Sequence, residues 1–164
     1  MKARWQPICA ALLAGSLLAG CGKAPKVDDT PQLREQLALL EARAQRLEDI
    51  NAIKRLQRSY GYYLDEGQWS DLADLFAADA TLEIGKDGVY RGRERIREYF
   101  RTLGNGRDGL APGQLNEHLH VMPVITLAED GRSARGTWRA VILAGQLGKE
   151  AWWSEGPYEN QYVK

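Results

Sequence analysis

The sequence predicts an α+β fold in which helices come first and long antiparallel strands follow. Within residues 33–64, apolar side chains recur at the three- to four-residue spacing of a helix. The period changes to two after Gly113, and glycine-containing turns separate three strand-like segments, 115–127, 133–145 and 150–163. The chain of 164 residues carries 22 basic and 22 acidic side chains, a balance that argues against a nucleic-acid-binding surface.

The N-terminus has the pattern of a bacterial lipoprotein signal. Lys2 and Arg4 form a positive n-region, residues 8–18 form an apolar h-region, and a Leu-Ala-Gly-Cys tetrapeptide ends at Cys21. This resemblance to a lipobox implies that residues 1–20 are a signal peptide and that Cys21 is acylated. The protein is then expected in the bacterial cell envelope, held by its lipid on the periplasmic side of the outer membrane. A simple cleaved signal and an uncleaved anchor are the alternatives.

Cysteine usage limits the chemistry that the mature chain can perform. The two cysteines are Cys9, inside the h-region, and Cys21, which would carry the lipid. The folded domain would therefore have no disulfide, no thiol nucleophile and no cysteine metal site. Loss of Lys2 and Arg4 with the signal leaves 20 basic and 22 acidic side chains.

A tether and a helical spacer are predicted before the main domain, which we place at residues 49–164. Residues 21–32 are polar and proline-containing, as in a flexible tether. Residues 33–48 carry apolar side chains at the 4-3-4-3 spacing of a coiled-coil seam, and a helix lying on the domain or a frayed spacer is the alternative. The pattern shifts by three residues near Asp49, which marks either a stammer in one long helix or a boundary between two helices.

Shorter elements are predicted between the long helix and the long strands. Ser70 is placed to cap a short helix over residues 71–77. The next elements are, in order, a strand (80–84), a strand (89–91), an amphipathic helix (92–103) and a glycine-rich loop that could cover a pocket (104–113). Pro123 predicts a bulge or an edge within the first long strand.

Four segments carry a recognisable signature: Tyr60–Ala80, Gly88–Gly92, Trp138 and Gly156–Tyr162. In order and spacing they resemble the SnoaL-like domains of the nuclear transport factor 2-like superfamily. The resemblance implies a cone, in which a curved, mostly antiparallel sheet wraps around helices and encloses an apolar pocket. It also implies one more strand after Lys164, so either the sequence is a fragment or a partner covers the unpaired edge.

The same resemblance implies acid–base chemistry. Scytalone dehydratase, ketosteroid isomerase and polyketide cyclases remove a proton next to a carbonyl, while a donor stabilises the enolate oxygen. Asp65 and His118 match a catalytic aspartate and histidine of scytalone dehydratase, and Tyr62 is a candidate donor one helical turn before Asp65. Leu64 and Trp138 stand where that enzyme has a tyrosine and a second histidine, so half of its catalytic set is absent.

Each candidate also has a structural interpretation. Asp65 could bond backbone groups at a helix end, and His118 could be a half-buried strand residue. His120 shares a strand face with His118, and with Asp65 the two could form a two-histidine, one-carboxylate metal site. Two ligands on one strand are weak evidence, so we expect no metal and no cofactor.

We expect the pocket to hold a small, mostly apolar molecule. The residues assigned to its lining are Trp69, His120, Met122, Trp138, Trp152 and Tyr158. Trp153 must face the opposite side from Trp152, where it marks a dimer interface or ordinary packing. The leading interpretation is a membrane-anchored binding domain with lyase- or isomerase-type chemistry. The alternative is a non-catalytic ligand-binding or oligomerisation module, and a homo-oligomer is expected in either case.

Overall fold

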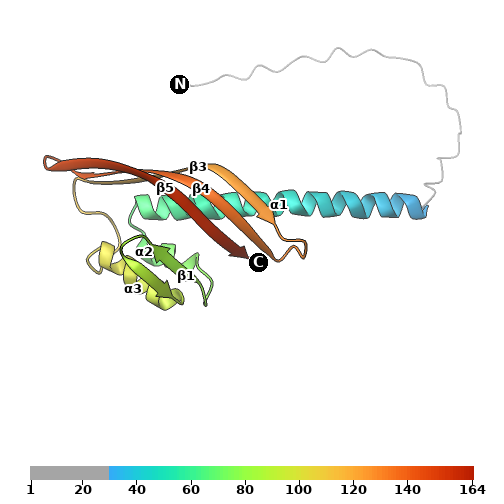
Figure 1. Ribbon diagram of the computed structural model, residues 1–164, viewed down its shortest axis with the longest axis horizontal. Helices are drawn as coiled ribbons and strands as arrows, with labels where there is room; N and C mark the ends of the chain where they lie inside the picture. The colour runs from blue at the N-terminus through green and yellow to red at the C-terminus, as the bar shows by residue number, and fades with distance from the viewer. Residues whose placement is uncertain (1–29) are drawn as a thin grey trace, which may run out of the picture.

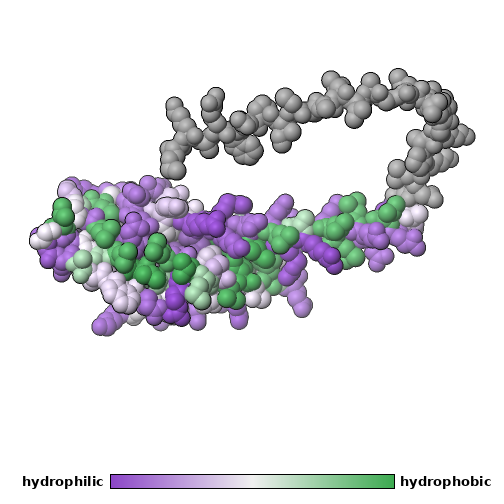
Figure 2. Space-filling model, turned by 90° about the horizontal axis from the view of Figure 1, so that it is seen from above, coloured by the Kyte–Doolittle hydropathy of each residue, from purple (hydrophilic) through white to green (hydrophobic). Residues whose placement is uncertain are grey.

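The computed structural model describes residues 30–164, so the predicted signal peptide, Cys21 and most of the tether lie outside the described residues. The first element, α1 (Pro31–Asp65), is one uninterrupted helix of 35 residues. The helix therefore passes through Asp49 without a boundary. Its N-terminal half, residues 31–48, is exposed along its whole length and projects beyond the rest of the fold (Figure 1). Figure 2 shows hydrophobic side chains gathered on this projecting part.

The C-terminal half of α1 packs on a three-stranded antiparallel sheet. The strands β3 (Gln114–Leu127), β4 (Ser133–Gln146) and β5 (Glu150–Val163) follow one another in the sheet, as the period-two pattern predicts. Buried helix residues Ile53, Gln57 and Gly61 recur every four positions and face the sheet. The predicted α+β fold with a curved antiparallel sheet is confirmed (Figure 1).

A bulge interrupts the first long strand at the predicted place. The register of β3 against β4 shifts between Val121 and Val124, and Met122 adopts a positive φ of 55°. Pro123 has no N–H to donate to the ladder, so the strand cannot continue its regular pairing through this position. The shift changes which side chains of β3 face the helix on either side of the bulge.

A smaller unit lies on the other side of the C-terminal end of α1 (Figure 1). It contains α2 (Trp69–Asp74), the hairpin strands β1 (Thr81–Ile84) and β2 (Gly88–Arg91), and α3 (Arg93–Leu103). Its core is formed by the fully buried side chains of Leu72, Ile96 and Phe100. The two strands form a sheet of their own, separate from β3–β5 in the described residues.

The start of α2 differs from the sequence prediction. The helix begins at Trp69 with Gln68 before it, so Ser70 lies inside the first turn and does not cap the helix. The carboxylate of Asp108 accepts a hydrogen bond from the backbone N–H of Ser70 at 3.1 Å. Asp108, 38 residues after Ser70, therefore provides the helix-capping acceptor that we expected from the Ser70 side chain.

A buried polar network ties α1 to the sheet. The Tyr162 hydroxyl accepts from Trp138 Nε1 at 2.9 Å and donates to Gln57 Oε1 at 2.9 Å. Asn160 Nδ2 donates to the same Gln57 oxygen at 2.8 Å. The network joins β4, β5 and α1 through one phenol, so removing that hydroxyl leaves the buried indole N–H of Trp138 without its partner.

We expect Tyr162→Phe to lower the free energy of unfolding by about 1–3 kcal/mol, because the buried Trp138 N–H loses its acceptor. Tyr62→Phe is the matched control, since the Tyr62 side chain is exposed. Urea unfolding followed by tryptophan fluorescence measures both variants. Equal stability of the two variants would show that the network contributes no net stability.

Candidate functional site

The structure brings Asp65 and His118 into direct contact. Asp65 ends α1 and His118 lies on the inner face of β3, and Oδ1 of Asp65 is 3.2 Å from Nδ1 of His118. The same oxygen accepts the backbone N–H of His118 at 2.7 Å. The two side chains are only 16% and 11% exposed, so the pair is largely shielded from water.

Strand β3 compensates for the unfavourable position of the Asp65 carboxylate at the C-terminus of α1. A negative charge at a helix C-terminus is disfavoured by the helix dipole. The two groups of His118 that bond Asp65 supply the compensating donors. Two residues earlier, Asn116 Nδ2 donates to the carbonyl of Leu64 at 2.8 Å and satisfies one of the last free carbonyls of α1. The last turn of the helix is thereby fixed to the N-terminal part of β3.

The environment of Asp65 favours its use in proton chemistry. Burial raises the pKa of Asp65 above its ordinary value, although the hydrogen bonds from His118 act in the opposite direction. When the carboxylate is ionised, it accepts Nδ1–H and leaves the lone pair of His118 on Nε2. A neutral imidazole held in this tautomer can act as a general base through Nε2.

His120 occupies an aromatic cage beside this pair. Its ring lies 4.8 Å from the ring of Tyr158 and 5.8 Å from that of Tyr60, centroid to centroid. Burial, with a smaller contribution from the charge of His118, lowers the pKa of His120 to about 4, so the ring is neutral at pH 7. A Cβ on Gly61 would lie 3.1 Å from Nδ1, which explains the glycine within α1 at this point.

Tyr60 is the residue of this site that the sequence analysis missed. It contacts His120, Tyr158 and Phe76, and burial raises its pKa well above the usual value. Its position three residues after Gln57 and seven after Ile53 places it beside the buried face of α1, a signal that was available in the sequence. Tyr158, assigned to the pocket from the sequence, does lie against His120.

Two predicted site residues point to solvent. Tyr62 is 69% exposed, because it follows Gly61 by one residue and therefore lies about 100° away from the buried face of α1. Met122 is 73% exposed, because the bulge breaks the alternation that would have carried it to the face of His118. Neither residue lines the site, and the expectation that they do is wrong.

Two predicted pocket tryptophans are core residues. Trp69 is buried in the core of the smaller unit, together with Leu72 and Phe100. Trp138 is buried between β4 and α1, with Ile53 and its hydrogen bond to Tyr162. Both indoles are large apolar groups that fill the interior, so packing uses the positions that we expected to line a cavity.

The tandem tryptophans of β5 lie near one end of the sheet. Trp152 pairs with Ala144 and lies on the same inner face of the sheet as Tyr158. Its side chain is nevertheless more than half exposed, because this end of the sheet extends past α1 (Figure 1). Trp153 lies on the opposite face and is exposed as well. Trp152 therefore does not line an enclosed pocket.

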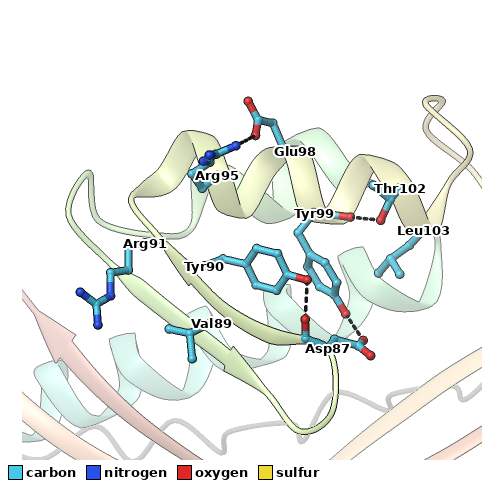
Figure 3. Close-up of a pocket in the computed structure, with 9 residues that line it drawn as sticks. All are labelled: Asp87, Val89, Tyr90, Arg91, Arg95, Glu98, Tyr99, Thr102 and Leu103. Carbon is cyan, nitrogen blue, oxygen red and sulfur yellow. Dashed lines mark hydrogen bonds and ion pairs between the residues drawn. The ribbon is translucent and has the colours of Figure 1, made fainter.

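An open groove of about 830 Å³ lies elsewhere, between the β1–β2 hairpin and α3 (Figure 3). Its wall contains the stacked rings of Tyr90 and Tyr99, 4.3 Å apart. Both hydroxyls are engaged by Asp87, Tyr90 at the backbone carbonyl and Tyr99 at the carboxylate. Asp65 and His118 are not part of this groove, and its polar groups hold the hairpin on α3.

Within residues 30–164, no group of three histidine, cysteine, aspartate or glutamate side chains is arranged to hold a metal ion. The geometry of Asp65, His118 and His120 explains this for the candidate triad. Asp65 is bonded to Nδ1 of His118, whereas the ring of His120 packs between two tyrosines and places Nδ1 against Gly61. The site contains one carboxylate–imidazole pair and a separate neutral imidazole.

The neutral state of His120 makes folding sensitive to acid. The unfolded chain takes up a proton near pH 6.5, whereas the folded pKa is about 4, so stability is lost as the pH falls through this window. We expect His120→Phe, which keeps an aromatic ring in the cage, to flatten the decline of the urea midpoint between pH 6.5 and pH 4. The raised pKa of Asp65 increases stability as the pH falls, and it does so equally in the unmodified protein and in the His120→Phe variant. Parallel pH profiles would contradict the assignment.

Comparisons with known proteins agree with this architecture. The chain is similar to a proposed scytalone dehydratase from Novosphingobium aromaticivorans, with 20% identity, a TM-score of 0.62 and coverage of 74% of this chain and 77% of that one. A type 2 hexachlorocyclohexane dehydrochlorinase gives 20% identity, a TM-score of 0.62 and coverage of 74% and 78%. A Catenulispora acidiphila protein in complex with S-DNPA gives 18% identity, a TM-score of 0.57 and coverage of 71% and 83%.

These structural likenesses show the fold. No curated protein sequence matches the chain. The family model of the SnoaL-like domain matches residues 45–164, which include the helix end, the smaller unit and all three long strands. The chain therefore belongs to the SnoaL-like domain family.

Proposed function

We propose that this domain binds a small, mostly apolar molecule and removes a proton from one of its carbon atoms, as a cofactor-free lyase or isomerase. The observation that carries the proposal is the shielded contact of 3.2 Å between Asp65 and His118. A carboxylate that fixes the tautomer of a neighbouring imidazole is the arrangement of a general base.

The proposed reaction assigns one role to each residue. Asp65 is a positioning residue that accepts Nδ1–H and stabilises the imidazolium that forms. His118 takes the substrate proton on Nε2 and can return it to another carbon or to a leaving group. Burial raises the pKa of Tyr158; the hydrogen bond with Tyr60 acts in the opposite direction, and the neighbouring Asp65 charge adds to the effect of burial. The phenol therefore stays protonated and can donate a hydrogen bond to a developing oxyanion.

The surroundings of His118 suit an apolar molecule. On the inner face of the sheet, its neighbour in β4 is Ile142, followed in β5 by Ser154. In the cross-strand pairs on either side of His118, the β4 residues are Ala140 and Ala144, whose small side chains limit crowding around the imidazole. Water exclusion at such a face would strengthen the electrostatic contribution of Asp65.

The names of the similar proteins support elimination chemistry. A dehydratase removes water and a dehydrochlorinase removes hydrogen chloride, and both names occur among the structures with this fold. A third structure holds a small molecule, which supports ligand binding. The identities of 18–20% mean that these parallels support the proposal through the fold alone.

A non-catalytic binding module is the second candidate, and one observation favours it. Asp65 also accepts the backbone N–H of His118, which is a structural tie between α1 and β3. Leu64 and Trp138, at the positions of the missing catalytic residues, are both buried in packing. The two candidates differ in whether Nε2 of His118 accepts a proton from a bound molecule.

The proton abstraction can be tested without the natural substrate. A nitrobenzisoxazole is a small aromatic probe that opens to a coloured phenolate when a base removes its ring proton. We expect the protein to accelerate this opening, and His118→Gln and Asp65→Asn each to reduce the rate by about 100-fold or more. Glu159→Gln, at an exposed position on the outer face of β5, is the matched control and should keep the rate.

Two outcomes of this experiment contradict the proposed base. A rate that is unchanged in both site variants would exclude Asp65 and His118 from proton transfer. Binding of the probe with no rate above that of free imidazole would favour the binding module. Urea unfolding of each variant separates lost chemistry from lost folding.

We further propose that acylated Cys21 holds the domain at a membrane surface. None of the helices within residues 30–164 is long and apolar enough to cross a membrane. The lipobox pattern before Cys21 supports attachment by lipid.

The anchoring proposal predicts the behaviour of a single variant. In bacterial cells, Cys21→Ser should abolish incorporation of labelled palmitate and release the protein from the membrane fraction. Cys9→Ser, inside the predicted signal, is the control and should remain in that fraction. Labelling that survives Cys21→Ser would contradict the assignment of this residue.

A further inference from the structure

The N-terminal half of α1 carries an apolar stripe that the described residues leave uncovered. All side chains of residues 31–48 are exposed, whereas burial begins at Asp49 and Ile50 (Figures 1 and 2). The stripe consists of Leu33, Leu37, Leu40, Ala44 and Leu47, and its four leucines are each about half exposed or more. We call residues 33–47 the arm.

A projecting helix of this kind is poorly stabilised by itself. Helices of fewer than about 12–15 residues are marginal in water, and most helical stability comes from burial of an apolar face. Within residues 30–164 the arm has no such burial, although four leucines lie on one side of it. A partner that covers this apolar face would supply the burial that the domain does not.

The spacing of the stripe specifies the kind of partner. The successive intervals of 4, 3, 4 and 3 residues place Leu37 and Ala44 at one core position of a heptad and Leu33, Leu40 and Leu47 at the other. Such a seam fits the same seam on another helix, because each side chain enters a hole between four residues of its partner. We infer that the arm pairs with the arm of a second copy of this chain, in a parallel two-stranded coiled coil.

Charges beside the stripe favour the parallel orientation. In a parallel pair, Arg43 on one flank of the seam lies near Glu48 of the second copy, five residues further along, and this contact occurs twice. These opposite charges stabilise the parallel arrangement.

The rest of the fold leaves room for the second helix. The next seam position is Asn51, which is exposed, while Ile53 two residues later is buried against the sheet. Two residues turn an α-helix by about 200°, so the seam faces away from β3–β5. The three-residue shift near Asp49 is therefore the point where the apolar face of α1 turns from the partner helix to its own sheet.

Two measurements on the full chain test the pairing, with Cys9 and Cys21 replaced by serine to remove other thiols. Sedimentation at micromolar concentration should give twice the mass of the chain. The double variant Leu37→Glu and Leu40→Glu should halve that mass. Leu39→Glu is the matched control, because Leu39 is exposed to the same extent as Leu37, 56%, but lies off the seam, and it should stay dimeric.

The orientation is tested by single cysteines. Leu47→Cys should form a disulfide between two copies on mild oxidation, since identical seam positions meet in a parallel pair, whereas Leu39→Cys should not. A monomeric parent chain, a mass above two copies or a dimer that survives the double glutamate variant would overturn the proposal. A dimer in which Leu47→Cys does not cross-link would overturn the parallel pairing.

Discussion

The structure depends on one geometric constraint, which is that only the C-terminal half of α1 has a sheet beside it. Over that half, Ile53, Gln57 and Gly61 lie against β3–β5, while Leu64 packs into the core of the smaller unit. These contacts fix the rotation of the helix. The same rotation brings Asp65, at the end of the helix, to His118. Over the other half there is no sheet, so the apolar side chains of the arm remain exposed.

Packing and chemistry use adjacent positions of the same elements. Gly61 gives the ring of His120 the space to lie against α1, and the cage of Tyr60 and Tyr158 keeps that ring neutral. Trp138, which we expected to line the pocket, fills the core instead. The site therefore consists of one carboxylate–imidazole pair in an aromatic environment, and any proton transfer must depend on this pair.

Local pattern predicted the elements well, and long-range contacts account for the errors. The change of hydrophobic period located β3, β4 and β5 to within one residue, and Pro123 located the bulge. The capping of α2 was missed, because Asp108 lies far away in sequence. For Met122, Tyr62 and Trp152, the errors concern where the side chain points, which depends on the bulge, on helix rotation and on the extent of the sheet. Trp69 and Trp138 were expected to line a pocket, but they fill the two cores.

The most direct test of the central claim is the tautomer of His118, read from the nitrogen chemical shifts of the labelled protein at neutral pH. The contact with Asp65 predicts that Nδ1 of His118 carries a proton, so that the lone pair of the neutral ring lies on Nε2. Asp65→Asn should change the balance of tautomers, while Glu159→Gln, on the outer face of β5, should leave it as it is. A His118 ring protonated on Nε2, with Nδ1 bare beside the carboxylate, would contradict the assignment of His118 as the base.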